Sequence, residues 1–415
     1  MRTRVKPSAA SSRWGDGVQF TDVETFVVAN PPPSYGGRYF VFVKLTTDTG
    51  AVGWGEVYSP PFDAATVHAV VEDIFERTVH GTDPFRIEER TRAIYSLAFT
   101  GRPDVTIGGV LSAFDMASWD IVGKETNRNV TDLLGGIVRD RVRSYTYLYP
   151  GDSDAGDAVY DDPELAAQRA LEYVEAGHTA IKFDPAGPYR EVGPRQPTPN
   201  ELDRSEAFVN AVRGAVGPRA DLLFGTHGQF TPSGAIRLGQ RLEAAAPLWF
   251  EEPCPPDIPE AMARVAAQCS VPIAAGERLT SVHEFKRLLD AGVGILQPNL
   301  GRAGGITAGN KIAAIAEAYG AQVAPHLYNG PLGGAANLAV GATISNFLVL
   351  EGIQEWDGFH AEILTNPVQW DAGFVIPFTG PGLGTEIDEG VARANPWTAG
   401  MTHLAMTPGT DEWPG

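Results

Sequence analysis

One pattern repeats six times along the second half of the chain: a short apolar run ends in a polar residue that could take part in chemistry. The runs are LLFGTH, PLWFE, PIAAGE, ILQPN, QVAPH and LVLE, and they end at His227, Glu251, Glu277, Asn299, His326 and Glu351. Consecutive ends lie 22 to 27 residues apart, which suits one buried strand, one helix and the two loops that join them. This spacing predicts a parallel β/α barrel, whose functional groups sit at the carboxyl ends of its strands.

The first part of the chain does not follow this rhythm. Residues 38–58, RYFVFVKLTTDTGAVGWGEVY, are rich in β-branched and aromatic residues around a turn and predict an antiparallel hairpin. Residues 110–124, VLSAFDMASWDIVGK, have the apolar spacing of a packed helix. The length of 415 residues allows a barrel of roughly 250 residues and a smaller second domain. We therefore expect an N-terminal α+β capping domain, a β/α barrel and a C-terminal tail that packs on the capping domain, over residues 1–137, 138–378 and 379–415.

Two further segments complete the predicted barrel. RVRSYTYLY, after the glycine pair Gly135 and Gly136, predicts the first strand, and AIKFD predicts the second. Lys182 and Asp184 are two residues apart in AIKFD, so both side chains should point into the barrel. The two could neutralise each other, but at the mouth of a barrel we favour a catalytic role.

Bulk properties restrict the partners and the location. The formal charge of −19 disfavours nucleic acid and anionic membranes, because neutralising phosphates needs a basic face. No apolar stretch reaches the ~18 residues of a spanning helix, and the N-terminus lacks the apolar core of a secretory signal. Cys254 and Cys269 have no metal-site spacing and are interpreted as ordinary residues. We expect a cytoplasmic enzyme that acts on a small molecule.

Acidic residues at two adjacent predicted strand ends indicate a metal site. Two buried carboxylates are costly unless they are paired or bind a cation, so Glu251 and Glu277 predict a divalent metal. The structural alternative is a salt bridge from either glutamate to Arg278. Glu252 alternates to the other face of its strand and is the better candidate for a purely structural partner. Of the eight histidines, only His227 and His326 end predicted strands, and for these two we favour function.

Taken together, several motifs resemble the enolase superfamily, mandelate racemase subgroup. They are GWGE, WFEEP, AAGE, QPNLGRAGGIT and APH, and the similarity extends from the hairpin to GPGLGTEIDE near the C-terminus. The histidine of GTHGQF makes the galactonate dehydratase-like acid-sugar dehydratases the closest match. The resemblance implies an α/β fold, a (β/α)7β modified TIM barrel with an N-terminal α+β capping domain that the C-terminal tail completes. It also implies a homo-oligomer.

The resemblance further implies abstraction of the proton α to a carboxylate, giving an enediolate held by Mg²⁺, and then loss of the β-hydroxyl to give a 2-keto-3-deoxy acid. Such a reaction needs a cation, a base and an acid. By position, Glu251 and Glu277 would be metal ligands and His326 the general base. Lys182 would contact the substrate carboxylate, and Glu351 would hydrogen-bond the enediolate.

Three positions depart from the family pattern. Gly225 stands where the first metal ligand, an aspartate, is expected, so His227, Asp184 or water must fill that place. If His227 is the ligand, the preference shifts from Mg²⁺ towards Mn²⁺, Fe²⁺ or Zn²⁺, and His227 is no longer free to protonate the departing hydroxyl. Asn299 replaces the aspartate that would make His326 more basic. Asp184 replaces a second lysine, which favours dehydration over two-base racemisation.

Residues 29–40, ANPPPSYGGRYF, are predicted to form a mobile lid, and a solvated loop is the alternative. Tyr35, Arg38 and Asn299 are the expected substrate contacts, and Arg102 in segment 97–109 is a weaker candidate. The leading hypothesis is a metal-dependent dehydratase of an aldonate or aldarate. The alternatives are another enolase-type lyase or isomerase, such as an epimerase or cycloisomerase, and a non-catalytic homologue that binds a sugar acid. A metal hydrolase barrel is disfavoured because the predicted first strand has no paired histidines.

Overall fold

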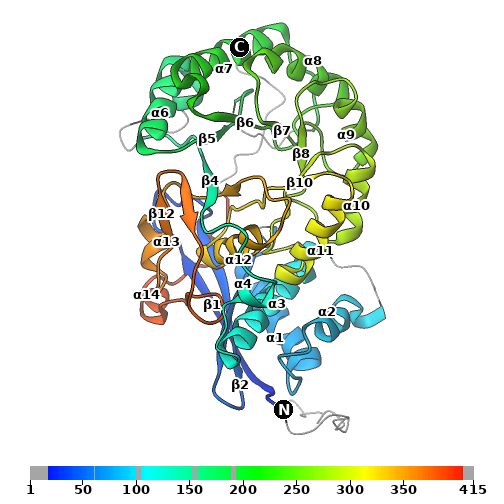
Figure 1. Cartoon of the computed structure of the whole chain (residues 1–415), viewed down its shortest axis with the longest axis vertical. Helices are drawn as coiled ribbons and strands as arrows, with labels where there is room; N and C mark the ends of the chain where they lie inside the picture. The colour runs from blue at the N-terminus through cyan, green and yellow to red at the C-terminus, as the bar shows by residue number, and fades with distance from the viewer. Residues whose placement is uncertain are drawn as a thin grey trace.

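The computed structural model describes residues 17–59, 61–99, 104–151, 154, 158–187 and 193–404. Its larger part is a barrel with helices on the outside, and its smaller part is a sheet covered by helices (Figure 1). The segment that holds Arg102 lies outside the described residues.

Three antiparallel strands form the N-terminal sheet, in the order β1 (Phe20–Ala29), β2 (Tyr39–Thr47) and β3 (Val52–Val57). The predicted hairpin is confirmed, since β2 pairs with β3 from Val41 opposite Val57 to Thr46 opposite Val52. Gly50 turns the chain between them with a positive φ of 83°, and its N–H donates to the carbonyl of Thr47. The strand β1, which pairs with β2, was not predicted.

Helices cover this sheet: α1 (Ala64–Ile74), α2 (Ile87–Tyr95), α3 (Val105–Glu125) and α4 (Val130–Leu133), with a π-helical turn at Phe75–Val79 and a 3₁₀ turn at Leu97–Phe99. The helix α3 packs directly on β3. A Cβ at Gly53 would lie 2.1 Å from the carbonyl oxygen of Ala117, and one at Gly55 would lie 2.0 Å from that of Ala113. The two glycines of the GWGE motif are therefore required by the close approach of α3.

The helix α3 is long and strongly apolar. By length and hydropathy α3 could cross a membrane, contrary to the sequence-based expectation that no stretch would qualify, but 78% of its apolar window is buried inside the protein. Asp104 caps the helix by accepting hydrogen bonds from the N–H groups of Thr106 and Ile107. The burial identifies α3 as a core helix of this fold.

Among the described residues, eight parallel strands form the barrel. They are β4 (Val142–Tyr147), β5 (Ala180–Phe183), β6 (Asp221–Gly225), β7 (Trp249–Glu251), β8 (Ile273–Ala275), β9 (Ile295–Leu296), β10 (Gln322–Val323) and β11 (Leu350–Glu351). Neighbours along the chain pair from β4 to β10, and β11 pairs with β4. A bridge between Val323 and Phe347 joins β10 to the segment before β11 and closes the ring. The predicted barrel and its fold class are confirmed.

The barrel helices are α5 (Ala158–Asp161), α6 (Pro163–Ala176), α7 (Pro199–Val216), α8 (Pro232–Leu242), α9 (Pro259–Ala266), α10 (Val282–Asp290), α11 (Gly305–Ala318) and α12 (Pro331–Thr343), with 3₁₀ turns at Gly217–Arg219 and Glu243–Ala245. Several begin with proline, whose missing N–H costs nothing in the first turn. At α7, Thr198 and Glu201 form a reciprocal capping box. Such local signals explain why the helices begin where they do.

One layer of side chains fills the barrel below its mouth. Each strand, or the residue directly before or after it, contributes one buried side chain to this floor: Tyr145, Ala180, Leu223, Trp249, Ala274, Ile295, Ala324 and Val349. Within this layer the rings of Tyr145 and Trp249 pack edge to face, with centroids 5.4 Å apart. Because side chains in a strand alternate with a period of two, residues two positions further along point into the barrel mouth.

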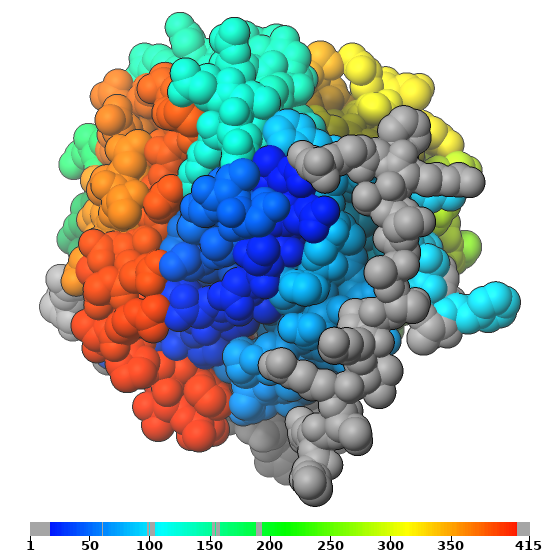
Figure 2. Space-filling model, turned by 90° about the horizontal axis from the view of Figure 1, so that it is seen from below, coloured from blue at the N-terminus to red at the C-terminus, as the bar shows by residue number. Residues whose placement is uncertain are grey.

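The C-terminal segment returns to the N-terminal domain. It contains α13 (Gly358–Glu362), the hairpin of β12 (Gln369–Asp371) and β13 (Phe374–Ile376), and α14 (Glu389–Ala394). The strand β13 pairs with the barrel strand β4. Beyond it, Val28 of β1 bridges to Pro396, and Arg38 donates its N–H to the carbonyl of His403. Figure 2 shows these C-terminal residues, in red, directly beside the N-terminal strands, in blue.

Acid should weaken this junction between the tail and the capping domain. Burial lowers the pKa of His403 from 6.5 to about 3, whereas the unfolded chain takes up the proton near pH 6.5. The free energy of unfolding should therefore fall as the pH drops from about 6.5 towards 3. At pH 5 this one group accounts for a loss of about 2 kcal/mol relative to pH 7. His403→Gln should reduce the difference between the unfolding free energies that urea titration gives at pH 7 and pH 5.

His283→Gln is the matched control, because that imidazole is exposed on α10. It should leave the pH dependence as in the unmodified protein. An equal pH dependence in His403→Gln and His283→Gln would contradict the assignment.

Candidate active site

The residues two positions beyond the floor layer form a polar layer at the barrel mouth. They are Tyr147, Lys182, Gly225, Glu251, Gly276, Gln297, His326 and Glu351. Gly276 has a φ of 138° and turns the chain. The side chain that reaches the mouth from this strand is therefore that of the next residue, Glu277. The barrel therefore brings together Lys182, Glu251, Glu277, His326 and Glu351, as the sequence predicts.

Lys182 lies at the centre of this layer and is almost completely buried. Its Nζ is 2.5 Å from Oε1 of Glu251 and 3.4 Å from Oε1 of Glu351. Burial alone would lower the pKa of Lys182, but the surrounding carboxylates of Glu251, Glu351 and Glu277 raise it above its ordinary value. The ammonium of Lys182 is therefore a permanent positive charge within the polar layer.

Glu251 is held at both oxygens. Oε1 accepts from Lys182, and Oε2 accepts a 2.7 Å hydrogen bond from Nε2 of Gln297. Burial raises the pKa of Glu251 to about 8, against the opposing effect of Lys182. A second cation beside Glu251 would favour its charged form.

Glu277 and Glu351 both approach the same nitrogen, Nε2, of the His326 ring. Nε2 of His326 is 3.4 Å from Oε2 of Glu277 and 4.0 Å from Oε2 of Glu351. Burial would raise the pKa of Glu277, but His326, His227 and Lys182 together lower it well below its ordinary value. The backbone N–H of Leu327 donates to Oε2 of Glu351 at 2.8 Å and fixes that carboxylate.

His227 reaches the site from the loop after β6, with a positive φ of 49°. Its Nδ1 lies 3.2 Å from Oδ1 of Asp184, and Oδ2 of Asp184 accepts a 2.6 Å hydrogen bond from the hydroxyl of Tyr147. Burial disfavours a charged imidazole, yet Asp184 raises the pKa of His227 to about 9. The two residues form a carboxylate–histidine pair across neighbouring strands.

The space beside Gly225, where the aspartate ligand was expected, is occupied by neighbouring side chains. A Cβ at Gly225 would lie 3.1 Å from Cε of Lys182, 3.2 Å from the hydroxyl oxygen of Tyr147 and 3.5 Å from Oδ1 of Asp184. Of the two side chains considered for the missing ligand, Asp184 comes nearer to this place than His227.

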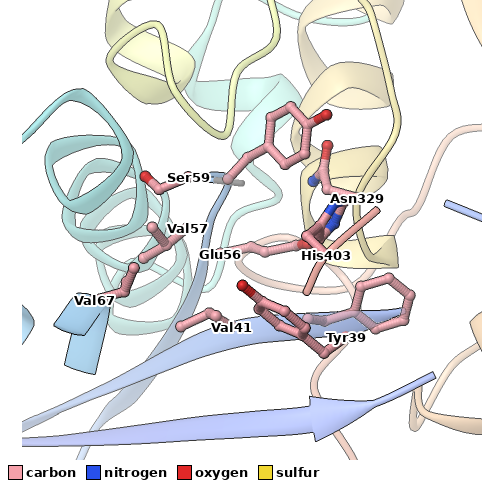
Figure 3. Close-up of a pocket in the computed structure, with 10 residues that line it drawn as sticks. Tyr39, Val41, Glu56, Val57, Ser59, Val67, Asn329 and His403 are labelled. Carbon is pink, nitrogen blue, oxygen red and sulfur yellow. The ribbon is translucent and has the colours of Figure 1, made fainter. Parts of the chain in front are cut away.

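Asn299 contacts His326 from the loop after β9. Nδ2 of Asn299 is 2.9 Å from Nδ1 of His326 and donates to Oδ1 of Asn329 at 3.1 Å. The buried carboxyl of Glu56 accepts hydrogen bonds from the N–H groups of Gly330 and Gly333, just after Asn329, and burial raises its pKa to about 7. Figure 3 shows Glu56 and Asn329 among the residues that line one small pocket beside the N-terminal strands. The GWGE motif thus supports the His326 loop from the capping domain.

The donors at the mouth suit a divalent cation, with fewer protein ligands than usual. Within the described residues, no group of three or more histidine, cysteine, aspartate or glutamate side chains is arranged around a common cation position. In that part of the chain, however, the buried Oε2 of Glu277 accepts no hydrogen bond. Two carboxylate oxygens with water or substrate oxygens satisfy a hard cation such as Mg²⁺ or Mn²⁺. Glu251 and Glu277 fit this role.

Other predicted residues lie at the edge of this cluster or outside it. Tyr35 stacks on Tyr149 with ring centroids 3.9 Å apart. Nη1 of Arg38 contacts Oγ1 of Thr402 in the C-terminal segment, so the structure does not bring Arg38 to the carboxylates. Nη2 of Arg278 pairs with Oε2 of Glu252 at 2.7 Å, in line with a structural role for Glu252.

Sequence reasoning missed three residues of the site: Tyr147, Gln297 and Glu56. The period of two could have found Tyr147 and Gln297, since each lies two residues beyond a floor residue on its own strand. Glu56 was quoted as part of a motif but given no role, because only the folded chain places it under Asn329.

Comparisons with known proteins agree with this architecture. The family described as mandelate racemase / muconate lactonizing enzyme, N-terminal domain, matches residues 23–135, and the family described as enolase C-terminal domain-like matches residues 165–391. Among curated proteins, a D-galactonate dehydratase of Variovorax paradoxus (strain S110) is 38% identical over 84% of this chain and 89% of its own length. One from Xanthomonas axonopodis pv. citri (strain 306) is 36% identical over 86% of this chain and 91% of its own.

Solved structures agree over nearly the whole chain. A mandelate racemase/muconate lactonizing enzyme from Sulfitobacter sp. has a TM-score of 0.92 and 48% identity, and the match covers 96% of this chain and 100% of that one. One from Jannaschia sp. CCS1 has a TM-score of 0.90 and 47% identity, covering 93% and 100%.

Restoring an acid at position 225 should strengthen metal binding. Gly225→Asp adds a third carboxylate next to Glu251, whose strand pairs with β6 at this residue. We expect the dissociation constant for Mn²⁺, measured by isothermal titration calorimetry, to fall about tenfold or more. Gly225→Ala adds the same Cβ without the charge and is the matched control. Equal Mn²⁺ affinities in the two variants would contradict a cation position beside Gly225.

Proposed function

Because the chain belongs to the enolase superfamily, through its mandelate racemase/muconate lactonizing enzyme domains, we propose that it is a metal-dependent dehydratase of an acid sugar. The substrate would be an aldonate or aldarate, and the product a 2-keto-3-deoxy acid. One observation carries the proposal: the barrel mouth brings together the buried carboxylates of Glu251 and Glu277, the buried ammonium of Lys182 and two imidazoles, those of His227 and His326. The names of the curated relatives support the same reaction class.

The difficult step in such a dehydration is removal of the proton α to a carboxylate, because negative charge then builds up on the carboxylate oxygens. A divalent cation held by Glu251 and Glu277 would supply the electrostatic stabilisation of that charge. The ammonium of Lys182 lies 2.5 Å from Glu251 and provides a second positive charge within the polar layer. It is positioned before the substrate arrives, so little reorganisation is needed during the reaction.

Glu351 completes the recognition of the substrate acid. Lys182 and the N–H of Leu327 hold its two oxygens, which orients the carboxyl towards His326. A carboxyl fixed in this way can share a proton with an enediolate oxygen, and we propose that role for Glu351. We propose Tyr35 as a substrate contact at the rim, where it stacks on Tyr149.

The two histidines supply the proton-transfer groups. His227 and His326 both lower the pKa of Glu277, so both imidazoles lie near this carboxylate. In a substrate bound through its acid group, the α-carbon and β-carbon would lie between them. Asp184 and Asn299 are then the partners that set the chemistry of each ring.

A panel of aldonates and aldarates, including both C2 epimers of each acid, tests the reaction class. With Mg²⁺ or Mn²⁺ present, we expect one acid to give a 2-keto acid, detected as its semicarbazone, and to exchange its α-proton in D₂O, detected by ¹H NMR. Lys182→Met should lower kcat/KM for that acid by about 100-fold or more, because a fixed charge next to the developing anion is lost.

The remaining outcomes separate the alternatives. Exchange of the α-proton without a keto acid would replace the dehydratase by an isomerase of the same family. Binding of the acids without exchange or product would replace it by a sugar-acid binding protein. Circular dichroism of Lys182→Met should match the unmodified chain, which separates loss of charge from loss of fold.

A further inference from the structure

We propose that Arg302 binds the second acid group of the substrate, so that this chain selects an aldarate, which has an acid group at each end, over an aldonate, which has only one. The inference deepens the proposed function and rests on it. Arg302 belongs to the QPNLGRAGGIT segment, which runs from the end of β9 into α11, and none of the roles assigned above involves it.

Arg302 is buried at the junction between the barrel and the capping domain, where only 8% of the residue is exposed. Its Cζ lies 4.1 Å from the centre of the Tyr58 ring, directly after β3. Its Nη1 donates to the backbone carbonyl of Glu277 at 3.3 Å. One face and one nitrogen of the guanidinium are therefore fixed before any substrate binds.

These contacts place the guanidinium beside the polar layer of the barrel mouth. Glu277 offers its carbonyl to Arg302, and its carboxylate lies 3.4 Å from Nε2 of His326. The ring of Tyr58 lies 6.1 Å from the ring of His326, measured between centroids. Arg302 thus contacts two residues, Tyr58 and Glu277, that both border the ring of His326.

The charge of Arg302 is not balanced by the protein around it. Other cations at the mouth pair with carboxylates: Nζ of Lys182 with Glu251 at 2.5 Å, and Nη2 of Arg278 with Glu252 at 2.7 Å. Among the described residues, no carboxylate forms an ion pair with Arg302. A buried charge is costly unless it is paired, so this guanidinium favours binding of an anion.

The unused edge of the guanidinium has the shape that recognises a carboxylate. Nε is buried and has no hydrogen-bond partner in the described part of the chain, and Nη2 makes no hydrogen bond there either. These two nitrogens lie on the same edge of the planar group, away from the Nη1 that Glu277 occupies. Their parallel N–H groups match the two oxygens of one carboxylate.

A purely structural arginine has a different pattern of bonds. Arg90 is the other arginine that is buried among the described residues, and it also lies over an aromatic ring, that of Phe20. Its Nη1 and Nη2 both donate to backbone carbonyls, those of Asp83 and Pro84. The backbone therefore satisfies Arg90 on its own, whereas Arg302 keeps an edge without an acceptor.

The length of an acid sugar suits this arrangement. The proposed cation position and the guanidinium lie at opposite ends of one residue, Glu277, whose carboxylate faces the first and whose carbonyl faces the second. The end carbons of an extended six-carbon chain are roughly 6 Å apart, a similar span. The far end of an aldarate is a carboxylate and can pair with Arg302. The far end of an aldonate is a neutral alcohol and cannot.

Matched pairs of acids isolate the contribution of the second acid group. The pairs are D-galactonate and galactarate, D-gluconate and D-glucarate, and D-mannonate and D-mannarate, whose members differ only in the oxidation state of C6. With Mg²⁺ present, we expect one of the diacids to bind at least about tenfold more tightly than its partner in isothermal titration calorimetry. For an acid that is turned over, the ratio of kcat/KM values replaces the ratio of dissociation constants.

Variants of Arg302 test whether this residue causes the preference. Arg302→Met should abolish it by weakening binding of the diacid alone, and Arg302→Lys should keep part of it, because an ammonium has the charge without the paired N–H groups. Lys311→Met removes the same charge from an exposed position on α11 and is the matched control, which should keep the full preference. Each ratio compares two ligands on the same protein, so a general loss of folded protein leaves it unchanged.

Equal binding of both members of every pair, or a preference that survives in Arg302→Met, would overturn the inference. A keto acid formed from an aldonate but from no aldarate would also overturn it, and would leave the proposed function standing. A preference for a diacid that depends on Arg302, without any keto acid, would support the second acid site and contradict the dehydration.

Discussion

A single buried ammonium, that of Lys182, makes the acidic layer of the barrel possible. Glu251, Glu277 and Glu351 converge at a depth where an unpaired carboxylate is costly, and Lys182 contacts two of them directly. Three carboxylates and one ammonium leave two negative charges when all are ionised and the histidines are neutral. A divalent cation would neutralise that remainder. When ionised, the three carboxylates therefore balance both the ammonium of Lys182 and a divalent cation, even though Gly225 contributes no ligand.

The period-two alternation of the strands explains how much of this could be read from the sequence. The strand ends gave the barrel, its order and five of the side chains at the mouth, because a polar residue after a buried apolar run is conspicuous. Tyr147 and Gln297 follow the same alternation. Tyrosine and glutamine are common near strand ends, however, so their role could be recognised only once the floor layer of each strand was known. The strand β1 was missed because its polar positions interrupt the apolar pattern on one face.

Other features could not be predicted because they depend on distances between distant segments. Glu277 belongs to the layer only because Gly276 turns the chain by one residue. The sequence places Asn299 beside His326 by resemblance, but it cannot say which end of the amide faces the ring. That choice is made by one backbone N–H, that of Gly301, which donates to Oδ1 of Asn299 and leaves Nδ2 facing Nδ1 of His326. The placement of Glu56 beneath Asn329 likewise needs the folded capping domain.

The three departures from the family pattern are physically connected. Replacing the aspartate at position 299 by Asn299 removes a carboxylate partner from one histidine, and Asp184 supplies such a partner to the other. Asp184 can do so because position 225 is a glycine: Oδ1 of Asp184 lies 3.5 Å from where a Cβ at Gly225 would be. An acidic side chain at both positions would crowd two like charges into that space, which is unfavourable unless a cation lies between them. We therefore interpret Gly225 and the Asp184–His227 pair as parts of one arrangement, in which an acidic side chain follows β5 and a glycine ends β6.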